Sequence, residues 1–180
     1  MIVVHAGHRV DAPDRATGLF PVGRDGSVYR RLYLLMMELR PRLVVTAAAG
    51  GADLLMLRVA EDLFIPRLVA LPLPVDDFVR RSVADQGDRW VEAFQHSLSC
   101  ADTVVTTDLS DHDDWWRRGN DFLHDCALDA RVRSNGSGAE PITAVVVRSS
   151  RCPASSGTAD FAAKAAGWGW PIHVVDPLED

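Results

Sequence analysis

Three short segments of the sequence combine glycine with residues that bind anions. They read Ala6-Gly7-His8-Arg9, Ala49-Gly50-Gly51-Ala52-Asp53 and, from Arg148 to Thr158, RSSRCPASSGT. Glycine lets main-chain N–H groups approach a ligand closely, and the planar guanidinium group of arginine fits a phosphate. Free N–H groups at the start of a helix add about 0.3–1 kcal/mol to a favourable anion contact. The three segments therefore predict a small site for a phosphate or diphosphate.

Each segment also has an ordinary structural interpretation. Asp53 is either a charge at the start of a helix or a hydrogen-bonding group for a ribose or a neighbouring loop. Ser156 is either a ligand donor or the N-cap of a helix in a polar loop. The residues that we expect to bind the ligand are Gly7, His8, Arg9, Gly50, Gly51, Asp53, Arg148, Arg151, Ser155, Ser156, Gly157 and Thr158.

Six apolar runs rich in β-branched residues alternate with helical patterns along the chain. The runs are continuous, as expected of strands buried on both faces. The expected strands are Ile2–His5, Leu43–Ala47, Arg67–Leu71, Thr103–Thr107, Ile142–Val147 and Pro171–Val175. The expected helices are Val28–Arg40, Ala52–Phe64, Asp76–Ala84, Asp88–Cys100, Asn120–Arg133 and Thr158–Ala166.

This alternation predicts an α/β fold with a doubly wound, mostly parallel, Rossmann-like sheet of about six strands and helices on both faces. The irregular stretches Arg9–Ser27 and Arg133–Glu140 do not mark a domain boundary, so we expect one domain over residues 1–180. Ligands of such sheets bind beyond the carboxyl ends of the strands, near the switch in strand order. The three glycine segments follow the first, second and fifth expected strands.

Composition narrows the class of partner. The chain of 180 residues has 19 Lys and Arg against 25 Asp and Glu, a net charge of −6, which argues against bulk nucleic acid as a partner. No apolar run approaches the roughly 20 residues that span a bilayer. The N-terminus does not read as a signal peptide, and three widely spaced cysteines form no metal or disulfide pattern. We expect a cytoplasmic protein without a membrane partner or a cofactor.

Arginine supplies every basic residue except Lys164. A GC-rich genome would explain that preference, but it would not explain where the arginines gather. Arg9, Arg15 and Arg24 follow the first expected strand, and Arg148 and Arg151 follow the fifth. We therefore expect these five near the crevice.

Other groups of reactive residues give weaker signals. His112, Asp113 and Asp114 lack the spacing of metal ligands, so no metal site is expected. Trp115 and Trp116, followed by two arginines, could stack on a base, pack in the core or contact a partner. No Gly-x-Ser-x-Gly nucleophile motif occurs, and nothing in the sequence suggests a base for Cys152.

Four motifs in this order resemble the SLOG superfamily, a Rossmann-like group that includes DprA/Smf proteins and LOG-type phosphoribohydrolases. They are Gly7-His8-Arg9, Gly51-Ala52-Asp53-Leu54, Leu71-Pro72 and Ser156-Gly157-Thr158-Ala159. The resemblance implies that the chain binds a nucleotide or a nucleotide-derived ligand. Some members cleave the N-glycosidic bond of nucleoside monophosphates, and others are sensors joined to effectors in bacterial conflict systems. LOG-like relatives usually form dimers, which implies a possible homodimer.

The chain departs from the LOG-type motif PGGxGTxxE, whose last glutamate is catalytic. Phe161 stands where that glutamate is expected, Asp160 lies one position early, and Ala154-Ser155-Ser156 replaces Pro-Gly-Gly. A helical step of about 100° turns Asp160 away from the required direction.

Three functions therefore stay open. The first is a sensor or regulatory module that binds a nucleotide-derived small molecule and acts alone or beside an effector protein. The second is an N-glycosidase of nucleoside monophosphates, for which Asp53, Asp160 or Asp121 would have to serve as the carboxylate. The third is a structural or partner-recruiting domain with an empty crevice.

Overall fold

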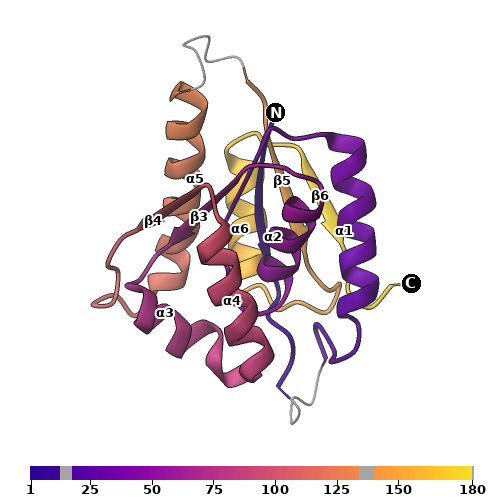
Figure 1. The fold of residues 1–180 in the computed structure, drawn as a ribbon, viewed down its shortest axis with the longest axis vertical. Coiled ribbons are helices and arrows are strands. Elements are labelled where there is room, and N and C mark those ends of the chain that lie inside the picture. Colours follow the sequence, from indigo (N-terminus) through magenta and orange to yellow (C-terminus); the bar gives the residue numbers. More distant parts are fainter. Residues whose placement is uncertain (13–17, 134–139, 180) are drawn as a thin grey trace.

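The computed structural model describes residues 1–12, 18–133 and 140–179. Six parallel strands form one sheet in the order β4-β3-β2-β1-β5-β6 (Figure 1). The strands are β1 (Ile2–Gly7), β2 (Leu43–Thr46), β3 (Arg67–Leu71), β4 (Thr103–Thr106), β5 (Ile142–Val147) and β6 (Ile172–Val175). The predicted doubly wound α/β fold is confirmed. The chain moves outward from β1 to β4 and then returns to place β5 on the other side of β1, so the switch in strand order lies between β1 and β5.

Helices cover both faces of the sheet. They are α1 (Asp25–Leu39), α2 (Ala52–Asp62), α3 (Val75–Ser82), α4 (Asp88–Cys100), α5 (Trp115–Arg133) and α6 (Gly157–Gly167), with the short 3-10 helix η1 (Ala84–Gln86) between α3 and α4. One core packs the apolar sides of α1, α2 and α4 against the sheet, and a second core packs α5 and α6 against its other face. Figure 1 shows α2 and α4 in front of the sheet and α6 behind it. No helix of the described ranges is long and apolar enough to cross a bilayer.

The central strands have the burial that the sequence predicts. Every residue of β5 is buried, as are the first four of β1, because each of these strands has a neighbour on both sides and helices on both faces. The edge strand β4 is largely exposed, with Val104 at 41%. The expected strands and helices are all present, with shifted ends. The largest shift is in α5, which begins at Trp115 and not at Asn120.

The C-terminal residues lie along α1, beside which Figure 1 places the C-terminus. Arg24 donates hydrogen bonds to the main-chain carbonyl groups of Pro177 (3.1 Å) and Leu178 (2.9 Å). Arg31 donates to the carbonyl group of Asp176 at 2.6 Å. Arg24 was expected near the crevice, and the structure instead places its guanidinium group on this C-terminal segment. Arg15 and most of the stretch Arg133–Glu140 lie outside the described residues.

Candidate functional site

A cavity of about 420 Å³ opens at the carboxyl ends of the central strands. Its walls come from the segments that follow β1, β2 and β5 and from the starts of α5 and α6, so it lies at the switch between β1 and β5. Its volume is in the range of ligand pockets. Of the predicted site residues, the structure brings together Gly7, His8, Arg9, Asp53, Ser155, Ser156, Gly157 and Thr158.

The start of α6 forms one wall of the cavity. Ser156 is the N-cap residue, and its Oγ atom accepts a hydrogen bond from the main-chain N–H of Ala159 at 3.1 Å. Gly157 and Thr158 line the cavity, and no partner for their main-chain N–H groups is found among the described residues. Thr158 Oγ1 also lies 3.4 Å from Nδ1 of the buried His8. This wall therefore presents two free N–H groups at the positive end of a helix.

The first turn of α5 forms an adjoining wall. Trp115 and Trp116 are half-buried and both line the cavity. A Cβ atom at Gly157 would lie 3.2 Å from the Trp116 ring, so a larger residue here would push the indole back by a few tenths of an ångström. Asn120 is buried one turn further along α5 and donates hydrogen bonds to the Gly157 carbonyl group (3.0 Å) and to Asp160 Oδ2 (2.9 Å). These bonds hold α5 and α6 together beside the cavity.

Positive charge enters the cavity from Arg9 and Arg81. The Arg9 guanidinium group donates to the carbonyl group of Arg81 at 3.0 Å and forms an ion pair with Asp85. Asp85 is more than half exposed and does not line the cavity. An anionic ligand would therefore compete with Asp85 for the Arg9 guanidinium group.

A buried acid and a buried histidine lie beneath the cavity floor. Asp53 accepts hydrogen bonds from the main-chain N–H groups of Gly7 and Ala49, each at 3.1 Å. Nε2 of the fully buried His5 lies 3.5 Å from Asp53 Oδ1. Burial raises the pKa of Asp53 to about 7, although its two N–H donors oppose that rise. Burial also lowers the pKa of His5 to about 4.

Asp53 lies in the first turn of α2 and accepts two hydrogen bonds from loops, so both the helix-start role and the loop contact that the sequence left open are compatible with the fold. The carboxyl group of Asp53 fixes the ends of β1 and β2 relative to each other, which is its predicted role toward a neighbouring loop. A hydrogen bond from Asp53 to a ribose stays a prediction. Asp53 is the only acidic residue among the described residues that line the cavity, so it is the carboxyl group available there for such a contact.

Neither Gly50 nor Gly51 lines the cavity, and the prediction of a free donor is wrong for the Gly50 N–H, while ligand binding by Gly51 stays a prediction. The Gly50 N–H donates to the carbonyl group of Ser82, and the Ala52 N–H donates to that of His8. Gly51 has φ 122° and forms an antiparallel bridge with Arg9. A Cβ atom at Gly51 would lie 2.7 Å from the main-chain nitrogen of Val10. The pair thus packs the segment after β1 onto the start of α2.

Four further candidates lie away from the cavity lining. Arg148 and Arg151 follow β5 and are not among the residues that line the cavity, and Arg151 is exposed. Asp160 interacts with Lys164 (3.3 Å) and with Asn120, so its carboxylate joins α5 to α6. Asp121 pairs with Lys164 on the surface. Phe161, at the position of the LOG-type glutamate, is fully buried in the second core.

Sequence reasoning missed several cavity residues. Arg81, Ser82 and Phe78 come from α3, which the sequence did not place near the crevice. Asn120 was treated only as the start of a helix. A buried asparagine on an otherwise apolar helical stripe was the one available signal, since burying an amide requires hydrogen-bond partners.

Together, the sheet and the cavity define an α/β protein with a doubly wound parallel sheet and a pocket at its switch point. No protein-family model matches the chain, and no curated protein matches it. Among solved structures, the DNA processing protein A (DprA) from Streptococcus pneumoniae is similar, with 14% sequence identity and a TM-score of 0.45. The match covers 95% of this chain and 57% of that one, so the chain spans little more than half of DprA.

Proposed function

We propose that the cavity binds a nucleotide-derived ligand through its phosphate or diphosphate group, and that the protein is a sensor or regulatory module. The observation that carries this proposal is the start of α6, whose two free N–H groups at Gly157 and Thr158 open into the cavity. A helix start with free N–H groups favours an anion. The resemblance of the four loop motifs to the SLOG superfamily supports the same ligand class.

The other wall suits the base of a nucleotide. Trp115 and Trp116 line the same cavity beside the start of α6, and stacking of a base on an aromatic side chain contributes about 1–3 kcal/mol. Arg9 and Arg81 supply positive charge, and Asp53 is the one acid among the described residues that line the cavity. In this proposal the phosphate lies at the start of α6 and the base lies against α5.

Ligand binding is tested by thermal denaturation and tryptophan fluorescence with AMP, ADP and ADP-ribose. A ligand at 100 times its dissociation constant should add about 2.7 kcal/mol to the free energy of unfolding. Trp116→Ala should weaken binding about tenfold or more, by loss of the stacking surface. Trp168→Ala is the matched control, because Trp168 packs against His124 and Trp170 at the far end of α6.

The outcomes separate the proposed functions. Stabilisation by none of these nucleotides would favour a structural or partner-recruiting domain. Binding that is equally weakened by Trp168→Ala would place the ligand outside the cavity. A sensor should also act with an effector protein or as a dimer, which analytical ultracentrifugation with and without the bound nucleotide would test.

One observation favours the enzymatic alternative. Asp53 lines the cavity, and its pKa of about 7 is suited to proton transfer near neutral pH. The alternative is cleavage of the N-glycosidic bond of a nucleoside monophosphate. Chromatography that detects sustained release of free base, abolished by Asp53→Asn in a protein that still binds the nucleotide, would replace the sensor by the hydrolase.

A further inference from the structure

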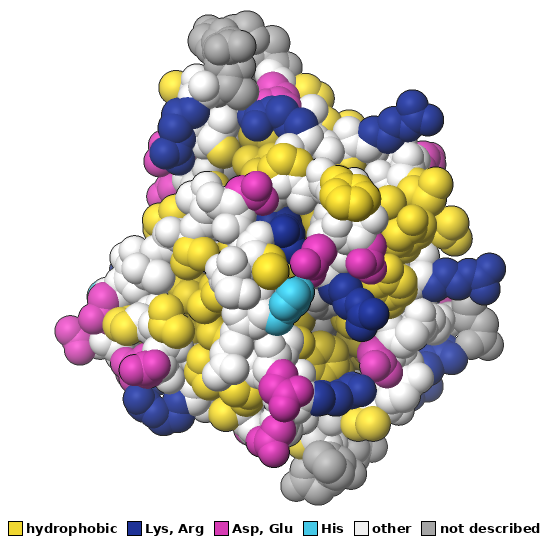
Figure 2. Space-filling view, in the orientation of Figure 1, with side chains coloured by type: hydrophobic (Ala, Val, Ile, Leu, Met, Phe, Trp, Pro, Cys, Tyr) yellow, Lys and Arg dark blue, Asp and Glu magenta, His cyan; other side chains and the backbone are white. Residues whose placement is uncertain are grey.

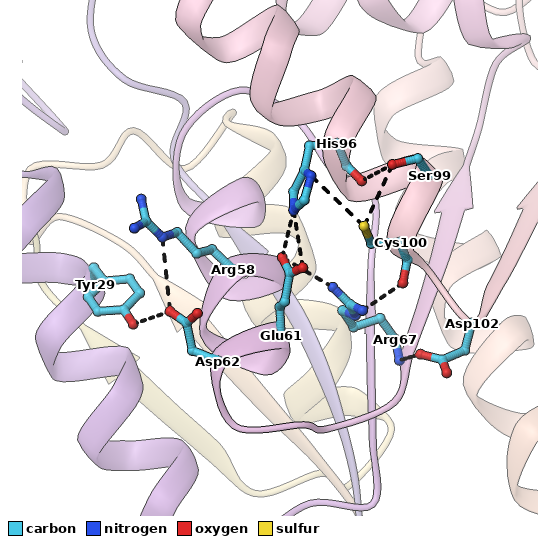
Figure 3. Close-up of polar contacts among 9 residues, drawn as sticks. All are labelled: Tyr29, Arg58, Glu61, Asp62, Arg67, His96, Ser99, Cys100 and Asp102. Carbon is cyan, nitrogen blue, oxygen red and sulfur yellow. Dashed lines mark hydrogen bonds and ion pairs between the residues drawn. The ribbon is translucent and has the colours of Figure 1, made fainter.

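A second hollow lies on the face of the molecule that α2 and α4 form. It has a volume of about 660 Å³ and shares no lining residue with the cavity at the switch point. Figure 2 shows a histidine side chain on this face between acidic and basic side chains. The last turns of α2 and α4 meet at this place, and their polar side chains form a cluster (Figure 3).

The cluster contains three residues with metal-binding atoms. Glu61 comes from the last turn of α2, and His96 and Cys100 lie four residues apart on α4, which puts them on the same side of that helix. One ligand atom of each lies within 4.8 Å of the others. His96 Nε2 is 3.0 Å from Glu61 Oε2, and Cys100 Sγ is 3.9 Å from His96 Nδ1.

These distances fit a tetrahedral metal ion. Bonds of about 2.0–2.3 Å from zinc to nitrogen, oxygen and sulfur place neighbouring ligand atoms about 3.3–3.6 Å apart. The separation of 3.0 Å between His96 Nε2 and Glu61 Oε2 is close to that range. Cys100 Sγ faces the other ring nitrogen of His96, so the thiol and the imidazole must rotate toward each other for Sγ and Nε2 to share one ion. A thiolate, an imidazole and a carboxylate form a mixed donor set that zinc accepts.

The surroundings hold the donors in place. Arg67 is largely buried, lies 3.5 Å from Glu61 Oε2 and donates a hydrogen bond of 2.6 Å to the main-chain carbonyl group of Cys100. It therefore ties the acid on α2 to the end of α4. Its positive charge is compatible with a bound metal, because a thiolate and a carboxylate already neutralise a divalent cation. His96 is 60% exposed, so one side of the cluster is open to water.

We propose that Glu61, His96 and Cys100 bind a borderline-soft divalent cation of the Zn²⁺ type, with the fourth position open to solvent. The cation binds Nε2 of His96, which now faces the carboxylate of Glu61, and coordination replaces that hydrogen bond. A bound cation clamps the ends of α2 and α4 together. The sequence predicts no metal site, and Glu61 lies 35 residues before His96, so local spacing does not bring the three donors together.

The experiment uses the full chain, kept reduced by a phosphine. Isothermal titration with ZnCl₂ should give one site per chain, and CoCl₂ should give the near-ultraviolet absorption of a thiolate bound to cobalt. Cys100→Ser and His96→Gln should each lower the affinity about tenfold or more, and Cys100→Ser should also abolish the thiolate absorption. Both side chains are partly exposed, so circular dichroism should show an intact fold.

Two matched variants serve as controls. Cys152→Ser removes another partly exposed thiol, and Glu92→Gln removes a second acid that lines the same hollow. Neither should change the affinity. The proposal is overturned if the chain binds no Zn²⁺, if Cys100→Ser and His96→Gln bind as tightly as the natural chain, or if the thiolate absorption disappears in Cys152→Ser and persists in Cys100→Ser.

Discussion

The pair of Asp53 and His5 under the cavity floor should give opposite pH dependences of stability when one partner is removed. His5 is fully buried and Asp53 is buried at the cavity surface, and burial shifts their pKa values in opposite directions. The folded protein holds a proton on Asp53 up to about pH 7, whereas an unfolded chain releases it near pH 4. The folded protein keeps His5 neutral down to about pH 4, whereas an unfolded chain protonates it below pH 6.5.

The signs follow from proton linkage. Between pH 4 and 7 the folded state binds more protons than the unfolded state at Asp53, so its contribution to the free energy of unfolding falls as pH rises. The fall is about 4 kcal/mol, from a pKa shift of about 3 units at about 1.4 kcal/mol each. At His5 the unfolded state binds more protons between pH 4 and 6.5, so the contribution of His5 rises by about 3 kcal/mol. In the natural chain the two contributions largely cancel.

Two variants separate the contributions. At every pH, Asp53→Asn should lower the free energy of unfolding by about 1–3 kcal/mol, because the amide cannot accept both N–H bonds. As the pH rises from 4 to 7, the free energy of unfolding of this variant should increase by about 4 kcal/mol relative to that of the natural chain. His5→Gln should lose about 3 kcal/mol between pH 4 and 6.5. Urea denaturation followed by tryptophan fluorescence measures both curves. Curves that run parallel to that of the natural chain would refute buried, oppositely shifted groups.

Urea denaturation also tests three changes at the packing around the cavity. Gly51→Ala should destabilise the protein by about 2 kcal/mol or more, because the residue has a positive φ and its Cβ atom would clash with main chain. Gly87→Ala is the control. Its φ is 101°, but no atom lies within 4 Å of the Cβ position, so the loss should be only about 1 kcal/mol. Ser156→Ala should lose about 1 kcal/mol, because the N-cap hydrogen bond to α6 disappears. Asn120→Ala should lose about 1–3 kcal/mol, because the buried amide that donates to the Gly157 carbonyl group and to Asp160 disappears. An unchanged midpoint for Gly51→Ala would show that the segment after β1 can move away.

Local patterns predict the fold because central parallel strands must be apolar on both faces. Continuous β-branched runs such as Ile142–Val147 identify those strands directly, and the helical stripes between them follow. The start of α5 escapes this reasoning for a physical reason. Trp115 and Trp116 line a cavity, and Trp115 packs against the first core, whereas the apolar stripe of the rest of the helix packs in the second core, so the two tryptophans do not continue that stripe.

The candidate site is harder to predict, because loops meet only through the order of the strands. The segments after β1 and β5 come together because those strands are neighbours, and no local pattern gives that order. Two adjacent glycines at a helix start look the same whether they contact a phosphate or another segment of main chain. At Gly51 the second case holds, since Arg9 occupies the space in front of it.

Arg24 and Arg31 bind the C-terminal segment through its main chain, so its position depends on the two arginines more than on the segment's own side chains. At Pro177 and Leu178 the arginine contacts are to carbonyl groups, which every amino acid provides. The side chains at these two positions can therefore change over evolution without loss of the attachment. Replacing Arg24 would remove the hydrogen bonds themselves. The position of residues 177 and 178 therefore depends on a side chain more than 150 positions earlier in the chain.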